Sequence, residues 1–404
     1  MKQLIFFIFL LYPLNAQVEP VIGIHSNTPR VWALTHGMVH TSPGDFIKDA
    51  TIIIRDGKID KVGRYVKVPS DAFQIDLKDA NVYPGFIDSW LEIKHDEKTT
   101  SPDEHWNSKV RASYRAKDDL KLKEKEIKEL HSIGMTTAHI VPQKGIFKGQ
   151  SDLVTISNKP VSISESVSLV IEFMSGKWSD REYPNSLLGA IALIRQTFLD
   201  ADWYAKSREI TLKFPAENEP LNKNHSLESL YNFKSANRPV LFHTENEHSA
   251  LRALNISDEF NLKPWLLGSG YEYRRLVEIS KHNPFIILPM DLPAKPKISD
   301  PDIALQYTTE QLKHWDMAPD NFSKIQDAGI FFSLSSHGLK KKSQFRTNLA
   351  RIIDRGFSKD VALASITTYP AEAMGASKTL GKIAPGFMAN LVIVDGDYFD
   401  PKSK

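Results

Sequence analysis

No cysteine occurs anywhere in the 404 residues of this chain. This absence excludes disulfide bonds, a catalytic thiol and membrane attachment through a lipidated cysteine. An excess of charge of one sign is also lacking, because 51 Lys and Arg residues are balanced by 49 Asp and Glu residues, which leaves a net charge of +2. Such a balance gives no reason to expect nucleic acid or an anionic membrane as a partner. With 41% hydrophobic residues, the chain can instead bury a large core by packing alone.

Long apolar runs are missing except at the N-terminus. A charged start is followed by an almost wholly apolar stretch from Leu4 to Leu14 and then by Asn15-Ala16-Gln17. This order is typical of a secretory signal peptide. The stretch is about a dozen residues long, short of the roughly 20 that cross a bilayer as a helix. We therefore expect residues 1–16 to be a cleaved signal peptide and the protein to be exported, periplasmic or secreted, with an uncleaved anchor as the alternative.

One stretch, residues 82–92, dominates the interpretation of the chain. It reads Val-Tyr-Pro-Gly-Phe-Ile-Asp-Ser-Trp-Leu-Glu, in which Pro84-Gly85 marks a turn and the apolar residues that follow predict a buried strand. Side chains alternate between the two faces of a strand, so Asp88, Trp90 and Glu92 are expected to share one face and look into one cavity.

Strand and helix patterns alternate through the rest of the chain. Strands are predicted at residues 31–39, 51–55, 58–62, 73–77, 134–141, 239–243, 264–268, 285–289 and 329–335, and helices at residues 116–132, 187–204 and 227–235. Asp56-Gly57 favours a hairpin, and Ser186 is placed to cap a helix. Residues 208–224 are interpreted as a surface insertion. Such alternation is typical of βα units around a parallel sheet.

Four runs carry a family resemblance: residues 84–88 (Pro-Gly-Phe-Ile-Asp), 134–137 (Gly-Met-Thr-Thr), 380–386 (Leu-Gly-Lys-Ile-Ala-Pro-Gly) and 389–392 (Ala-Asn-Leu-Val). They resemble the barrel and closing segments of the amidohydrolase superfamily, in particular imidazolonepropionase-like exported members. The chain is most similar to the less catalytic first half of tandem amidohydrolase proteins. The resemblance implies an α/β fold, a (β/α)8 TIM-like barrel with a small discontinuous β-sandwich built from the N- and C-terminal segments.

The resemblance also implies domain limits. Residues 17–83 and 384–404 correspond to the two parts of the β-sandwich, and residues 84–383 correspond to the barrel. The sequence stops at Lys404, where the family's final sandwich strand would follow. Either the sandwich is shortened or a partner completes it.

Metal ligands of the family fall on strand ends, and most of them are changed here. Trp90 and Glu92 stand where the resemblance implies a His-x-His pair, and serines stand near the implied aspartate of the eighth strand. His243 ends a Pro-Val-x-x-His strand and is the one ligand position that matches. A stable zinc site generally needs three or four protein ligands. We expect Trp90 to fill the space that a metal would occupy.

Two interpretations of the remaining histidines stay open. In one, Glu92, His243 and His337 form a rearranged metal site and are also the catalytic candidates. In the other, His139 and His337 are hydrogen-bonded wall residues and His243 is a packed remnant of the family's ligand. No cofactor is expected under the second interpretation; under the first it is a divalent metal such as zinc.

The resemblance implies a metal-dependent hydrolase acting on carbon-nitrogen bonds other than peptide bonds, with cyclic amides as typical small-molecule substrates. Because hydrolysis needs a metal-activated water and a carboxylate base, we expect weak or no activity from this chain alone. The alternative function is that of a non-catalytic partner for a second, competent amidohydrolase domain or subunit.

Overall fold

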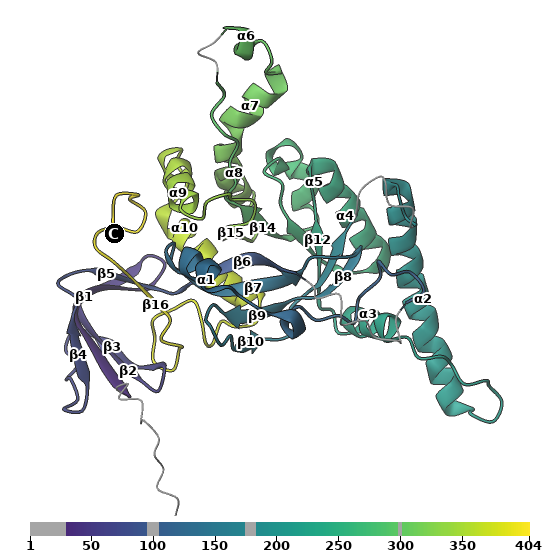
Figure 1. Cartoon of the computed structure of the whole chain (residues 1–404), viewed down its shortest axis with the longest axis horizontal. Helices are drawn as coiled ribbons and strands as arrows, with labels where there is room; N and C mark the ends of the chain where they lie inside the picture. The colour runs from purple at the N-terminus through teal and green to yellow at the C-terminus, as the bar shows by residue number, and fades with distance from the viewer. Residues whose placement is uncertain (1–29, 95–104, 174–182, 298–300) are drawn as a thin grey trace, which may run out of the picture.

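The computed structural model describes residues 30–94, 105–173, 183–297 and 301–404. The predicted signal peptide lies outside these residues. Within them the protein is mixed α/β, and its strands form three sheets (Figure 1). Among the described helices, none is both long and apolar enough to cross a bilayer.

The first sheet combines strands from both ends of the described chain. Its members are β1 (Val31–Ser42), β2 (Asp45–Arg55), β3 (Lys58–Gly63), β4 (Phe73–Asp76), β5 (Asn81–Pro84) and β16 (Leu391–Val394). Asp56 and Gly57, both at positive φ, close the β2–β3 hairpin as the Asp-Gly pattern predicts. The C-terminal strand β16 pairs antiparallel with β5, so the two terminal segments do come together. These described strands make one sheet, and the second, facing sheet of the predicted sandwich is not shown.

Two further sheets contain the remaining strands. One consists of β6 (Phe86–Ile93), β7 (Met135–Pro142), β9 (Asp152–Thr155) and β10 (Ser162–Ser164). The other runs in the order β15 (Phe332–Ser335), β14 (Phe285–Pro289), β13 (Lys263–Leu267), β12 (Pro239–His243), β11 (Leu169–Glu172) and β8 (Phe147–Gln150). From β11 to β15 all neighbours are parallel, as repeated βα units require.

The predicted (β/α)8 barrel is not confirmed as one closed ladder within the described residues. Strands β7 to β11 follow one another in sequence without an intervening helix, and β8 and β9 run antiparallel to β11 and β7. The βα alternation is therefore interrupted after β7. The two sheets meet where β15 lies beside β6, and the hydroxyl of Ser335 donates a hydrogen bond to the carbonyl of Trp90 at 3.2 Å.

Helices follow most strands of the third sheet. The helical elements are η1 (Ala116–Asp119), α1 (Glu124–His131), α2 (Leu187–Lys213), α3 (His225–Ser235), α4 (Glu247–Phe260), η2 (Glu272–Arg274), α5 (Leu276–Ser280), α6 (Pro301–Ala304), α7 (Thr309–Met317), η3 (Ala318–Asp320), α8 (Asn321–Asp327), α9 (Gln344–Asp354), α10 (Lys359–Ile366) and α11 (Thr368–Ala373). Ser186 caps α2 as predicted, since its hydroxyl accepts a hydrogen bond from the Gly189 N–H at 3.2 Å. The helix continues through Lys213, so the first part of the predicted surface insertion is helical.

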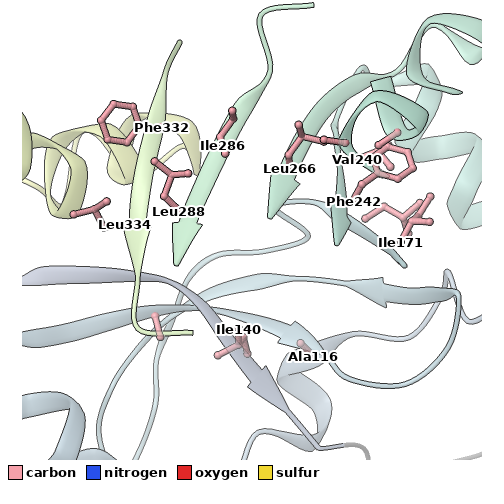
Figure 2. Close-up of a cluster of buried hydrophobic side chains, with 14 of the residues drawn as sticks. Ala116, Ile140, Ile171, Val240, Phe242, Leu266, Ile286, Leu288, Phe332 and Leu334 are labelled. Carbon is pink, nitrogen blue, oxygen red and sulfur yellow. The ribbon is translucent and has the colours of Figure 1, made fainter. Parts of the chain in front are cut away.

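Alternation along the parallel strands divides the core into two clusters. Val240, Phe242, Leu266, Ile286 and Leu288 belong to the larger cluster, which Figure 2 shows on one face of the third sheet. The residues between them belong to the other cluster, on the opposite, interior face: Leu241, Trp265, Leu267, Phe285 and Ile287. Alternate residues of a strand point to the same face. A polar residue at a strand end therefore lies on the interior face when it is two residues after a member of this second cluster.

Candidate functional site

Two neighbouring strands of the third sheet end in polar residues on the interior face. Glu172 continues the series of Val170 on β11, and His243 continues that of Leu241 on β12. The two residues are direct partners in the strand register. Nδ1 of His243 lies 3.2 Å from Oε1 of Glu172, close enough for an ion pair when the imidazole is protonated, but the two atoms form no hydrogen bond. His243 was chosen from the sequence as the end of a family-like strand, and Glu172 was not among the residues chosen.

Glu172 also forms a buried ion pair with Lys148 of β8. Their Oε2 and Nζ atoms are 2.7 Å apart, and the lysine side chain is only 2% exposed. Burial on its own favours a higher pKa for Glu172, but the neighbouring His243 and Lys148 outweigh burial and hold the pKa below its ordinary value. Glu172 is therefore an anion at neutral pH, and it lies between a lysine and an imidazole.

Trp90 lies at the centre of the residues selected from the sequence. Its side chain is 1% exposed, and its ring centroid lies 5.6 Å from that of His243 and 5.6 Å from that of His337. The indole Nε1 donates a hydrogen bond of 3.4 Å to Oε1 of Glu92. The two imidazole centroids are 5.9 Å apart. We call the five residues Trp90, Glu92, Glu172, His243 and His337 the strand-end site.

The alternation predicted for β6 is broken by a bulge. Its register against β7 shifts between Asp88 and Leu91, and Ile87 and Trp90 both pack in the interior cluster. Trp90 and Glu92 remain together, as their hydrogen bond shows. Asp88, which was expected to share their face, instead reaches across to the end of β15. The expectation that all three side chains look into one cavity is corrected in this respect.

The carboxylate of Asp88 is fully enclosed by hydrogen-bond donors. Oδ1 accepts from the Ser335 hydroxyl at 2.8 Å and from the Ser336 N–H at 3.1 Å, and the Ser336 hydroxyl donates to Oδ2. Lys342 Nζ donates to the hydroxyl and the carbonyl of Ser336 at 2.7 and 2.9 Å. Asp88 and both serines are fully buried. This cluster joins β6 to β15, and its groups have no open approach for a substrate.

His139 is a hydrogen-bonded wall residue, as one interpretation of the sequence predicted. Its Nδ1 lies 3.0 Å from the Ser89 carbonyl and its Nε2 lies 2.7 Å from the Ser151 hydroxyl. Complete burial lowers the pKa of His139 to about 4, so the ring is neutral at pH 7. Burial also lowers the pKa of His337, although the charge of Glu92 opposes this effect. Both rings therefore stay uncharged near neutrality.

Two cavities open beside these residues. A cavity of about 250 Å³ contains Glu172 and His243 in its wall, together with Arg252 and Asn246 of α4 and its N-cap. A larger cavity of about 600 Å³ lies between β6 and α1 and is lined by Glu92, Lys342 and charged residues of the α1 region. Glu92 and His243 thus line different cavities, with Trp90 between them. The smaller cavity has the size and mixed lining suited to a small polar molecule.

The described candidate ligands do not fit a metal ion. Across the described residues, no group of three or more His, Asp or Glu side chains is arranged to hold a metal ion. The proposed ligands Glu92, His243 and His337 surround Trp90, whose indole nitrogen carries only a donor hydrogen. The structure therefore brings the three candidates near one another without giving them a common coordination point. We derive no catalytic step through a metal.

Comparisons with known proteins agree with this architecture. The model of the amidohydrolase family matches residues 320–404. An amidohydrolase from Thermotoga maritima MSB8 matches the structure with a TM-score of 0.75 at 21% identity, over 92% of this chain and 96% of that one. A prolidase complexed with N-methylphosphonate-L-proline matches with a TM-score of 0.53 at 14% identity, over 91% and 93%. A Xaa-Pro dipeptidase with methionine bound in its active site gives 0.53 at 13% identity, over 91% and 94%.

These likenesses define the fold class of this chain, which is that of the amidohydrolase, the prolidase and the Xaa-Pro dipeptidase named above. The match of residues 320–404 to the amidohydrolase family supports the same class from sequence. No curated protein matches the chain.

Lys148, Glu172 and the Asp88 cluster are the features that sequence analysis missed. Glu172 ends the run Leu-Val-Ile-Glu just as His243 ends Pro-Val-Leu-Phe-His, so the rule that found one could have found the other. Lys148 carries no comparable signal, because it lies in a glycine-containing segment where no strand was predicted.

Proposed function

We propose that this chain is an amidohydrolase-related protein that binds a small polar molecule at the strand-end site and has weak or no metal-dependent hydrolytic activity alone. The observation that carries the proposal is the position of Trp90 between His243 and His337. An indole occupies the space between the two imidazoles and offers no lone pair to a cation. The cavity beside Glu172 and His243 is the binding space.

Hydrolysis of carbon-nitrogen bonds other than peptide bonds is the activity that the family resemblance implies. It requires a nucleophilic water, usually activated by a metal, and a general base. Asp88 is the buried carboxylate nearest to the end of β15, and hydrogen bonds from Ser335 and Ser336 occupy its oxygens. We infer that Asp88 does not act as the base, which favours binding over hydrolysis as the function of this chain.

A second candidate function is that of a partner for a competent amidohydrolase domain or subunit. The same altered strand-end site favours it, because a chain of this fold that does not hydrolyse can still pack against one that does. In this case the rate of the competent enzyme rises when this chain is added, and the chain alone shows no turnover.

Metal analysis of the purified protein tests the proposal. We expect far less than one zinc per chain after incubation with excess zinc and removal of the unbound ion, and no change in melting temperature with a chelator. Hydrolysis of cyclic amides and of Xaa-Pro dipeptides should stay at background. The matched variants Glu92→Gln and His243→Gln should not change the metal content.

One zinc per chain, lost together with hydrolytic activity in both variants, would overturn the proposal. It would establish the rearranged site of Glu92, His243 and His337 instead. Calorimetric titration with small polar molecules shows whether the protein binds a ligand at all. Arg252→Ala and Glu172→Gln should lower the affinity for any ligand held in the smaller cavity.

A further inference from the structure

An exposed apolar stripe runs along the longest helix, α2. Its members are Leu188, Ala192, Leu199, Trp203, Ile210 and Phe214, the last of which caps the helix. The intervals between them alternate between four and seven residues, so all six lie on one face of an α-helix. The five large side chains are between 51% and 79% exposed. Such an exposed apolar row, interrupted only by Arg195 and Lys206, is typical of an interaction surface.

The stripe is not needed to hold α2 on the rest of the protein. A different face of the helix is buried, through residues that include Leu193, Ile194, Phe198 and Tyr204. In Figure 1, α2 lies at the margin of the molecule, and its C-terminal end extends beyond α3. A second helix could therefore approach the stripe.

We infer that the stripe is covered by α2 of a second copy of this chain, with the two helices antiparallel. The intervals of four, seven, four, seven and four residues are the same in either chain direction, so an antiparallel copy matches them. A two-fold axis at the level of Ala201 places Leu199 opposite Trp203 of the copy, because both lie two residues from the axis. The same register places Ala192 opposite Ile210 and Leu188 opposite Phe214, at nine and thirteen residues from the axis. Symmetric contacts of this kind are the commonest way in which identical chains pair.

The sizes of the paired side chains favour the antiparallel arrangement. In each pair the smaller residue comes from the N-terminal half of one helix and the larger residue from the C-terminal half of the other. Each layer then has a small and a large member, which lets the side chains interdigitate. A parallel pair would place Trp203 against Trp203 and Ala192 against Ala192, which leaves one layer crowded and another open.

The charges near the stripe fit the same register. Arg195 and Lys206 lie on the stripe face, and the two-fold axis places them opposite Ser207 and Gln196 of the copy. Neither cation is directly opposed to another cation, so the register avoids like-charge repulsion. Three acidic residues offset most of the charge of the four basic residues in α2, so the helix has little attraction to an anionic lipid surface.

The eleven-residue spacing of the stripe also keeps it facing the second copy along the whole helix. Leu188, Leu199 and Ile210 are separated by eleven residues each, which corresponds to about 3.67 residues per turn. This value is close to the 3.6 of a straight α-helix, so the stripe drifts little around the axis. Two straight helices can therefore stay paired over the whole of α2.

Sedimentation velocity over a range of protein concentrations tests the inference. We expect a monomer–dimer equilibrium in which Trp203→Glu and Ile210→Glu each raise the dissociation constant at least ~30-fold, as expected for a central apolar anchor. Leu212→Glu is the matched control: Leu212 is 72% exposed on the same helix but lies off the stripe. This variant should dimerise like the unaltered protein.

Cross-linking tests the register, and the lack of native cysteine makes it clean. A mixture of Ala192→Cys and Ile210→Cys chains should form the mixed disulfide dimer faster than Ala192→Cys alone forms its own dimer. The inference is overturned if the unaltered protein stays monomeric at its highest soluble concentration, if Leu212→Glu disrupts dimers as much as Trp203→Glu does, or if the stripe binds vesicles as a monomer.

Discussion

Replacing Lys148 by methionine tests whether the Lys148–Glu172 contact is a true buried ion pair. Methionine is unbranched like lysine, matches its side chain as far as Cε, and removes the charged ammonium group. The lysine is 2% exposed and the glutamate 18% exposed, with 2.7 Å between Nζ and Oε2. Removal of one partner from a buried pair costs about 3–5 kcal/mol, because the other charge stays buried without compensation. His243 still lies beside Glu172, so we expect the lower end of this range, about 3 kcal/mol.

A double-mutant cycle supplies the control. Glu172→Gln should also cost about 3 kcal/mol, since it leaves the ammonium unpaired, whereas the double variant should cost no more than either single change. The free energies of unfolding come from urea titrations at pH 7 followed by tryptophan fluorescence. If the double variant loses the sum of the two single losses, the residues are independent and the account of this pair is refuted.

The pH dependence gives a second readout of the same pair. The pKa of Glu172 is held below its ordinary 4.5, so the folded protein gains stability above that pH and loses it as the pH falls toward the lowered value. In Lys148→Met the pKa of Glu172 should rise, and the loss of stability between pH 5 and pH 3 that depends on Glu172 should become smaller. An unchanged acid dependence would contradict the ion pair.

Two further predictions concern the interior. The pKa of His139 is lowered from 6.5 to about 4, so between these pH values the histidine binds a proton in the unfolded chain but not in the folded protein. The unaltered protein should therefore lose about 3 kcal/mol of stability relative to His139→Asn between pH 7 and pH 4. A stability difference between the two proteins that is constant with pH would rule this out. Trp90→Ala should lower the free energy of unfolding by about 3–5 kcal/mol, measured with urea, because the indole is packed between two imidazoles. Trp90→Phe should lower it less. A loss below about 1 kcal/mol for Trp90→Ala would show that the ring is not a packed core residue.

Local patterns in the sequence predicted much of the fold. An apolar run predicted the strand that His243 ends, and a serine before an apolar run located the start of α2 at Leu187. The Asp-Gly pair predicted the hairpin between β2 and β3. Each of these signals depends on residues that are close in the chain, and each describes a local backbone preference that the tertiary structure keeps.

The rest depends on contacts between distant segments. The bulge in β6 exists only relative to its register against β7, so the alternation of Asp88, Trp90 and Glu92 could not show it. The enclosure of Asp88 requires Ser336, which is 248 positions away. Likewise, no strand was predicted at β8, because its pairing with β11 carries no local signature, and the same holds for the antiparallel pairing of β9 with β7.

The pairing of β16 with β5 has a consequence for how the chain is made. These strands are joined in space but lie about three hundred residues apart, so β16 leaves the ribosome long after β5. The first sheet therefore waits with an open edge at β5 while the intervening strands and helices are synthesised. Contacts of such long range slow folding and leave that edge exposed to wrong partners. During synthesis, the β5 edge is where we expect a chaperone to bind.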